Sequence, residues 1–279
     1  MRAQPILFRL TAAAAVSGLL IAPGMARIAQ AQPAPPAGAA APAGDPPSRV
    51  GRLARLQGTV SFRAADESPW ETATLNWPVT TGNAFWTEPG AAAAIEVGAS
   101  HIALDQATEF DIASLDDHAL VATEAQGAAY LRLRDVPQSD SFTINTPRGS
   151  VTIAAAGRYE VAAGDTATPT RITVVEGVAQ IAVGTLTLDV QARQTATLTG
   201  TDTYVGSVGA EADDALLTAQ LALEQPQAPA TQPTPATPVA NAPPAVVLQM
   251  TGGDAVEATG EWAATPQYGH VWYPPVAAG

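Results

Sequence analysis

The sequence of 279 residues contains no cysteine, and all 13 of its basic residues are arginines because lysine is absent as well. The absence of cysteine excludes a disulfide framework, a thiolate nucleophile, a zinc–thiolate site and a lipid attached through an N-terminal cysteine. The absence of lysine excludes Schiff-base chemistry and a phosphate-loop lysine. We therefore expect the folded part to rely on its hydrophobic core alone.

Positive charge is scarce: 13 basic residues stand against 26 acidic ones, for a formal net charge of −13. Arg2, Arg9 and Arg27 lie in a segment that we expect to be removed, which leaves 26 acidic and 10 basic residues and a charge of −16. An acidic surface repels phosphate backbones and anionic lipid headgroups. The composition thus argues against a nucleic-acid partner and against electrostatic docking to membranes.

The first 31 residues are typical of a secretory signal peptide. Arg2 and Arg9 precede an apolar run at 10–21, and the small-x-small triplet 29–31 predicts cleavage after Ala31. An uncleaved anchor is the alternative, but the run is shorter than the roughly 20 residues that span a bilayer. No later segment is long and apolar enough to do so. We expect a periplasmic or secreted protein without a transmembrane segment after cleavage.

Alternation of polar and apolar residues fills most of residues 49–205, and many of the alternating runs begin with glycine. Examples are the runs at 58–62, 127–133 and 177–183. Successive side chains of a strand point to opposite faces, so each run predicts a strand with one apolar and one polar face. Turn signals recur at intervals of about 8–12 residues, which is typical of all-β folds. The sequence predicts an all-β body that is either a β-sandwich or a short β-solenoid.

The segments around this body differ in composition. Residues 32–48 are an Ala/Pro-rich tether, and residues 225–245 are a linker of Pro, Ala, Gln and Thr. Neither can bury a core, so both are expected to be disordered. Residues 206–224 are expected to hold a short helix with a narrow leucine stripe, which either packs on the sheet or leads into the linker. Residues 246–279 form a tail rich in Trp, Tyr and Pro.

Residues suited to catalysis or metal binding show no supporting pattern. The three histidines, His101, His118 and His270, have no metal-ligand spacing, and each is expected to be exposed. The acidic segment 105–117 lacks the order of a calcium loop, and no Gly-x-Ser-x-Gly elbow occurs. Carboxylate pairs for glycoside hydrolysis arise by chance in any acidic β-protein. We predict no catalytic, metal or cofactor-binding residue, and a protein that is not an enzyme.

Clustered aromatic residues are the best candidates for a partner-binding surface, because aromatic rings stack on sugars and anchor peptides. The candidates are Trp70, Trp77, Trp86, Trp262, Tyr268, Trp272 and Tyr273. The first three could instead serve as core and edge cover of the sheets. The last four lie in the tail, where we expect no core for them to enter. They either dock onto another molecule or belong to a fold that this chain only begins.

Several short motifs of the body resemble a family of periplasmic domains named after FecR, the iron-dicitrate signalling regulator. They include Thr81–Gly82 followed by the stretch 86–91, the run 142–147 that leads into 149–153, and the strand 157–161. The tail resembles the start of a Trp/Tyr/Pro-rich domain of unknown function. The resemblance implies a β-sheet body and a role in signalling through protein partners.

The chain also departs from this family. A regulator of this kind has a cytoplasmic sigma-factor-binding segment and a membrane span before the periplasmic domain, whereas this chain is expected to begin with a signal peptide. Direct control of a sigma factor therefore cannot be carried over. The Trp/Tyr/Pro pattern of relatives continues beyond the position where this chain stops at Gly279, so we expect a shortened chain.

The sequence as a whole predicts an exported, non-enzymatic, FecR-like binding module of the bacterial envelope. We expect its partner to be an envelope protein, and its role to be periplasmic signalling or another protein–protein interaction. The alternative is a structural envelope component that contacts cell-wall polymer or carbohydrate. A carbohydrate-active enzyme is a third and weaker alternative.

Overall fold

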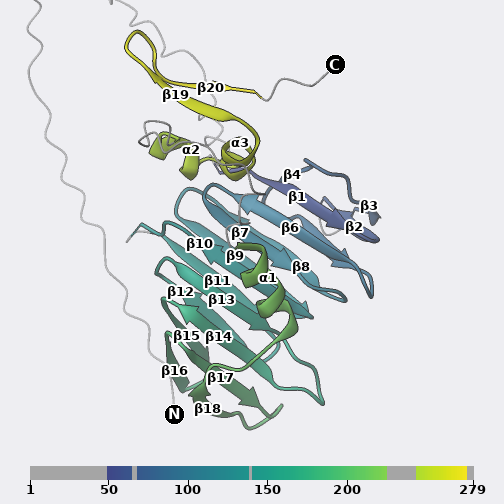
Figure 1. The fold of residues 1–279 in the computed structure, drawn as a ribbon. Coiled ribbons are helices and arrows are strands. Elements are labelled where there is room, and N and C mark those ends of the chain that lie inside the picture. Colours follow the sequence, from purple (N-terminus) through teal and green to yellow (C-terminus); the bar gives the residue numbers. More distant parts are fainter. Residues whose placement is uncertain (1–48, 65–67, 138–139, 225–242, 275–279) are drawn as a thin grey trace, which may run out of the picture. The chain divides into compact units, whose positions relative to one another are not determined.

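The body of the protein consists of two nine-stranded β-sheets (Figure 1). The structure is a computed structural model that describes residues 49–64, 68–137, 140–224 and 243–274. Sheet A contains, from edge to edge, β4 (Pro78–Val79), β1 (Gly51–Gln57), β6 (Ala92–Val97), β7 (Ser100–Leu104), β10 (Ala128–Leu133), β13 (Gly157–Ala162), β14 (Thr170–Glu176), β17 (Gln194–Thr199) and β18 (Val205–Ala210). Sheet B contains β3 (Glu71–Thr72), β2 (Val60–Arg63), β5 (Ala84–Thr87), β8 (Glu109–Leu115), β9 (Ala119–Gln126), β11 (Ser141–Thr146), β12 (Gly149–Ile153), β15 (Val178–Val183) and β16 (Leu186–Gln191). The predicted all-β class is confirmed.

The chain alternates between the two sheets as it proceeds. The hairpin β6–β7 belongs to sheet A, β8–β9 to sheet B, β13–β14 to sheet A and β15–β16 to sheet B. Apart from β1/β4 and β2/β3 at the first edge, strand order in each sheet therefore follows the sequence. Strands β9 and β11 pair in parallel, because β10 crosses to sheet A between them. The body is a sandwich in cross-section, and its strands follow one another along the sheets as in a solenoid.

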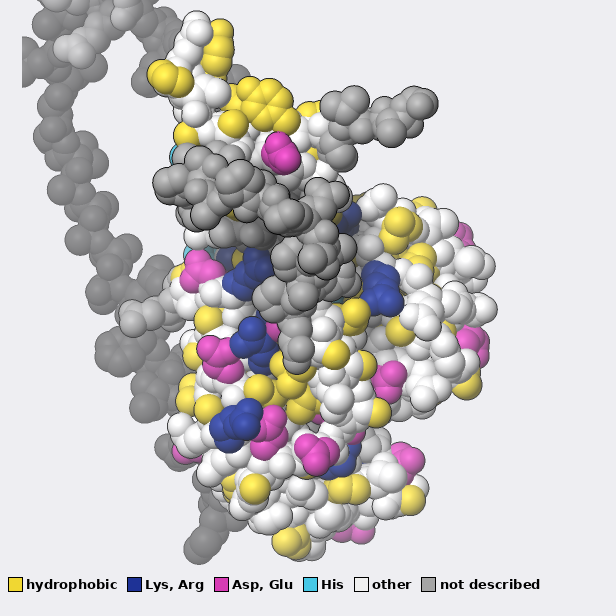
Figure 2. Space-filling view, viewed as in Figure 1, with side chains coloured by type: hydrophobic (Ala, Val, Ile, Leu, Met, Phe, Trp, Pro, Cys, Tyr) yellow, Lys and Arg dark blue, Asp and Glu magenta, His cyan; other side chains and the backbone are white. Residues whose placement is uncertain are grey.

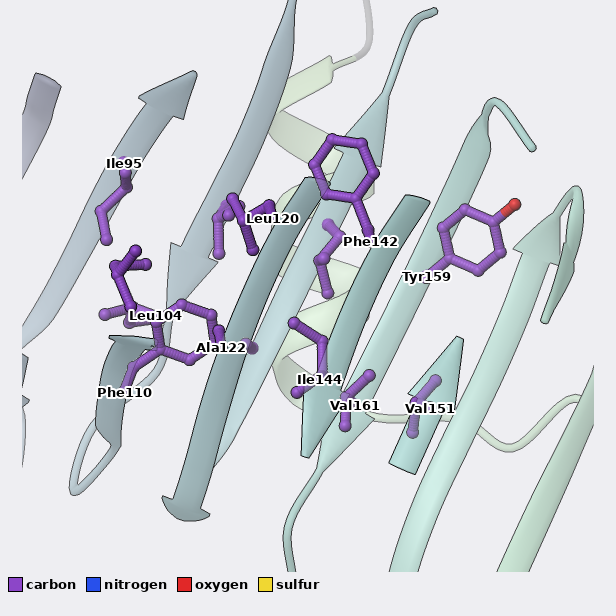
Figure 3. Packing of buried hydrophobic residues seen from close by; sticks show 14 of the residues in the cluster. Ile95, Leu104, Phe110, Leu120, Ala122, Phe142, Ile144, Val151, Tyr159 and Val161 are labelled. Atoms are coloured by element: carbon purple, nitrogen blue, oxygen red, sulfur yellow. The ribbon is translucent and has the colours of Figure 1, made fainter. Parts of the chain in front are cut away.

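The core lies between the sheets and contains the apolar member of each alternating pair. Ile95 and Leu104 of sheet A and Phe110 and Leu120 of sheet B are all buried in one cluster (Figure 3). Polar partners such as Arg132 and Thr143 point to the outer faces, where they are less buried. Alternation along the sequence thus corresponds to the inner and outer faces of the strands, as the pattern predicts.

Several predicted boundaries shift in the structure. The β body does not end at residue 205, because strand β18 continues it to Ala210. The helix expected within 206–224 is confirmed as α1 (Ala215–Glu224) and occupies only the second half of that range. The tail begins with two short helices, α2 (Ala245–Gln249) and α3 (Gly253–Thr259). The hairpin of β19 (Glu261–Thr265) and β20 (Gly269–Tyr273) follows them.

The predicted signal peptide, the tether and nearly all of the linker lie outside the described residues. Within the described part of the chain, no helix has the length and apolarity needed to cross a bilayer.

Helix α1 packs against the outer face of sheet A. Leu216 and Leu217 are buried in a small cluster with Ala103 and Tyr130. The hydroxyl of Tyr130 donates a hydrogen bond to Oε1 of Glu224, the last residue of the helix, over 2.7 Å. Of the two roles that the sequence leaves open for the leucine stripe, packing on the sheet is the one observed.

Charged groups fix both ends of this helix. Asp214, just before its first turn, accepts the backbone N–H of Leu216 at 2.9 Å and pairs with Arg171 at 2.9 Å. At the other end, Glu224 pairs with Arg158 at 2.7 Å and with Arg132 at 3.7 Å. These contacts hold α1 across the strands of sheet A.

Two glycines with positive φ allow a test of the packing at the connections between strands. Gly127, between β9 and β10, has φ +90, and a Cβ there would collide with the backbone and side chain of Thr108. Gly184, between β15 and β16, has φ +56, with nothing within 4 Å of the Cβ position. We expect Gly184→Ala to lower the free energy of unfolding by about 1 kcal/mol and Gly127→Ala by about 3 kcal/mol, because only the latter adds a steric clash. Urea denaturation of both variants measures the difference, and equal losses would contradict this account of Gly127.

Candidate binding surfaces

An exposed aromatic surface covers the end of the sandwich where the first strands lie. Residues 70–77 run from β3 at the edge of sheet B to β4 at the edge of sheet A. Along this path Trp70 is 43% exposed, Leu75 56% and Trp77 37%. We call Trp70, Leu75 and Trp77 the aromatic edge.

Contacts with Phe62 and Arg63 hold the two tryptophans of the aromatic edge in place. The ring of Trp77 lies 5.1 Å from the ring of Phe62, which is buried and lies in turn 5.4 Å from Phe85. The guanidinium of Arg63 lies over the ring of Trp70 at 4.9 Å, a cation–π contact. The rings are therefore positioned by the sandwich, as edge cover of the sheets, while one part of each remains exposed.

The third tryptophan of the body, Trp86, has a different location. It lies on β5 in register with Ser61 of β2 and Glu109 of β8, and it is partly buried on the outer face of sheet B. Its strand neighbour Phe85 points the other way and is fully buried in the core. Trp86 is therefore part of the sheet surface and is not a member of the aromatic edge as defined here.

The aromatic residues of the tail divide into two kinds. Trp262 and Trp272 are direct partners across the β19–β20 hairpin and are partly buried. The indole N–H of Trp272 donates a hydrogen bond to the carbonyl of Val256 in α3 over 3.2 Å. The two tryptophans therefore lie against each other across the hairpin, and Trp272 also contacts α3. Tyr268 and Tyr273, which are 73% and 51% exposed, remain surface groups of the hairpin.

The histidines and the acidic segment lie at separate places on the body. His101 is on the outer face of sheet A, in register with Glu96 and Arg132. His118 lies 3.3 Å from Asp140. Asp116 accepts the backbone N–H groups of His118 and Ala119, and these bonds lower the pKa of its carboxyl. Its role is to close the turn between β8 and β9. The described ranges contain no group of three or more His, Cys, Asp or Glu side chains suited to a metal ion.

The burial of two glutamates, Glu124 and Glu160, was not predicted from the sequence. Glu124 on β9 is fully buried, and one of its oxygens accepts the backbone N–H of Ala163 at 3.0 Å. Burial raises the pKa of this carboxyl well above its usual range. Glu124 follows Leu120 and Ala122 at intervals of two residues, and both of these are buried. This spacing puts all three side chains on the same face of β9, so the sequence could have placed Glu124 on the core face. A dissolved substrate has no access to this carboxyl, so a catalytic role for it has no support.

The second buried carboxyl, Glu160, lies on β13 beside Tyr130, beneath the start of helix α1. It is 2% exposed. Burial, and then the neighbouring carboxylate of Asp214, raise the pKa of Glu160 to about 8, while Arg171 acts in the opposite direction. Its position on a polar face gave no hint of burial, because the cover comes from a helix more than 50 residues later in the chain.

Comparisons with known proteins give no family for this chain. No family model matches it, and no curated protein is similar to it. Two crystal structures from Parabacteroides distasonis, each provisionally described as an anti-sigma factor, share 12% and 14% sequence identity with it at TM-scores of 0.43 and 0.38. The matched regions cover 50% and 44% of this chain. They cover 64% and 55% of the two crystallised chains, so this chain spans less than two thirds of the length of either. Similarities this low carry no argument about fold or function.

The burial of Glu160 predicts a pH dependence of stability. The folded protein holds this proton up to a pKa of about 8, whereas in the unfolded chain the pKa is the ordinary 4.5. Its contribution is therefore fully present below pH 4.5 and is lost as the pH rises to about 8, by at most about 1.4 kcal/mol per pH unit. Relative to Glu160→Gln, the wild-type protein should lose stability between pH 5 and pH 8.5 in urea denaturation.

Glu71→Gln, at an exposed position on β3, controls for the loss of one negative charge. Glu124 is present in wild type and in both variants, so only the part of its titration that depends on the charge of Glu160 enters the comparison. A stability difference between wild type and Glu160→Gln that stays constant over this pH range would contradict the prediction.

Proposed function

We propose that this protein is an exported, non-enzymatic, FecR-like binding module of the bacterial envelope that acts by contacting a partner protein, in periplasmic signalling or in another assembly. The observation that carries the proposal is the aromatic edge. Its rings are held by Phe62 and Arg63, yet they stay exposed at the end of the sandwich. Ordered and exposed aromatic side chains are the usual anchors of protein interfaces, because they bury large areas with little loss of side-chain freedom.

Export and membership of the FecR-like group belong to the same proposal. They are supported by the signal-like residues 1–31 and by the short motifs of the body. The absence of a catalytic role is supported by the locations of the titratable groups. Glu124 and Glu160 are buried, and Asp116 closes a turn.

A second candidate function is that of a structural envelope component that contacts cell-wall polymer or carbohydrate. The exposed faces of Trp70 and Trp77 favour it, because indole rings also stack on sugars. The two candidates use the same surface and differ in the partner.

Truncation of two of the three side chains of the aromatic edge should weaken partner binding. We expect the double variant Trp70→Ala/Leu75→Ala of the full chain to lose affinity for its envelope protein partner by about tenfold or more, because the exposed anchors are truncated. The partner is first captured from envelope extract on immobilised wild-type protein, and the affinity of each variant is then measured by surface plasmon resonance.

Val205→Ala is the matched control, since Val205 is an apolar residue 63% exposed on β18 at the opposite end of sheet A. It should bind as wild type does. Co-sedimentation with purified peptidoglycan that depends on Trp70 and Leu75, without any captured protein, would replace the first candidate with the second. Equal binding by the double variant and wild type would contradict both.

A further inference from the structure

A groove of about 560 Å³ lies between helix α1 and the outer face of sheet A. Its floor is formed by Ala92 and Ala94 of β6 and Ala103 of β7, where Ala94 and Ala103 are direct cross-strand neighbours. Alanine side chains are short, so the floor is recessed below the larger side chains around it. The volume falls within the range of about 300–1,000 Å³ that is usual for small-molecule sites.

Helix α1 supplies an apolar wall to this groove. Leu216 is buried against the sheet, while Leu223, one residue before the end of the helix, lines the groove and is 60% exposed. Because both ends of the helix are fixed by ion pairs with Arg171 and Arg158, the wall is held at a set place over the alanine floor. An apolar surface is thus kept open next to solvent.

Basic side chains surround the same floor. Arg55 lies beside Ala94 in the register of β1 and β6, while His101 and Arg132 are cross-strand partners one row away, and all three line the groove. On the face that carries α1, Figure 2 shows dark blue and magenta side chains close to yellow ones. Asp105 and Glu224 line the groove as well, so its two guanidinium groups are matched by two carboxylates, and the question is which guanidinium has a carboxylate partner.

The two guanidinium groups of the groove differ in their partners. Arg132 pairs with Glu224 at 3.7 Å, and Glu224 also accepts hydrogen bonds from Tyr130 and Arg158. Arg55 contacts the side-chain oxygen of Gln57 at 3.5 Å and forms no ion pair within the described residues. Asp105 also lines the groove, at the level of Ala92 in the strand register and one row from Arg55 and Ala94, and the described residues show no ion pair between it and Arg55.

We propose that this groove is a binding site for a small organic anion with a short apolar chain. The carboxylate of such a ligand would pair with the guanidinium of Arg55, while its chain would lie on Ala94 and Ala103 and cover Leu223. Contact with Arg55 exchanges water for a charge-assisted hydrogen bond, and burial of Leu223 removes apolar surface from solvent. The site lies on the outer face of sheet A and is separate from the aromatic edge, so it does not depend on the proposed function.

Octanoate is the probe that tests this site, with 1-octanol and inorganic phosphate as separate arms. In amide NMR spectra of the full chain, octanoate should cause saturable shifts centred on Ala94, Ala103 and Leu223. Its dissociation constant should be at least tenfold lower than that of 1-octanol, which has the chain without the charge. Phosphate, which has charge without the chain, should also bind more weakly than octanoate.

Two variants examine the two halves of the interaction. Arg55→Gln removes an exposed guanidinium and should weaken octanoate binding about tenfold, and Ala94→Leu should fill the floor and abolish the shifts. The controls are Arg193→Gln, at the turn before β17, and Ala182→Leu, at an exposed position of β15 in sheet B. Both controls should bind as wild type does.

Three results would overturn the proposal. They are shifts that centre on residues outside the groove, equal affinities for octanoate and 1-octanol, and unchanged binding by Arg55→Gln in a variant with a wild-type urea midpoint. Because none of these readouts involves Trp70 or Leu75, failure here is distinguishable from failure of the aromatic edge.

Discussion

Each sheet of this body can bury its apolar face only against the other sheet, and the chain builds both at once by crossing between them. Ile95 lies on sheet A and Phe110 on sheet B, and the chain crosses from one sheet to the other between them. Both residues nevertheless belong to the same buried cluster. Neither sheet is a stable unit by itself, because an open sheet would expose a full row of leucines, isoleucines and valines. In a chain without disulfides, this shared core is what holds the body together.

The outer faces are consequently free to vary, and the features of interest lie on them or at the ends. Sheet A carries Arg132, Arg158 and Arg171, which anchor a helix, and alanines beneath that helix, which leave a hollow. A buried arginine, Arg148, has a different task. Its guanidinium donates to the backbone carbonyls of Gly200 and Thr168 and so ties the turn after β11 to two other loops. Arginine serves well here because its planar group can reach several acceptors at once.

The sheets were predictable from the sequence because alternation has the same period as the strand itself. Strand β18 was missed since its residues, from Val205 to Ala210, are mostly exposed and include two glycines, so the pattern is lost there. For the candidate binding surfaces, the sequence indicates which residue types take part but does not indicate where each side chain lies. Trp77 and Trp86 look alike in the sequence, yet the first meets Phe62 at an open end and the second lies within a strand of sheet B. The groove required knowledge of where α1 lies on sheet A, which depends on ion pairs between residues more than 40 positions apart.

The order of strands along each sheet has a consequence for how such a body could change in size. Neighbouring strands lie about 4.8 Å apart, so one more hairpin in each sheet would lengthen the sandwich by about 10 Å. Because each hairpin contacts mainly its neighbours in its own sheet and the strands facing it, such an insertion would leave distant parts of the body unaltered. The distance between the aromatic edge at the first strands and the edge at β18 is therefore a quantity that gain or loss of hairpins can adjust in steps.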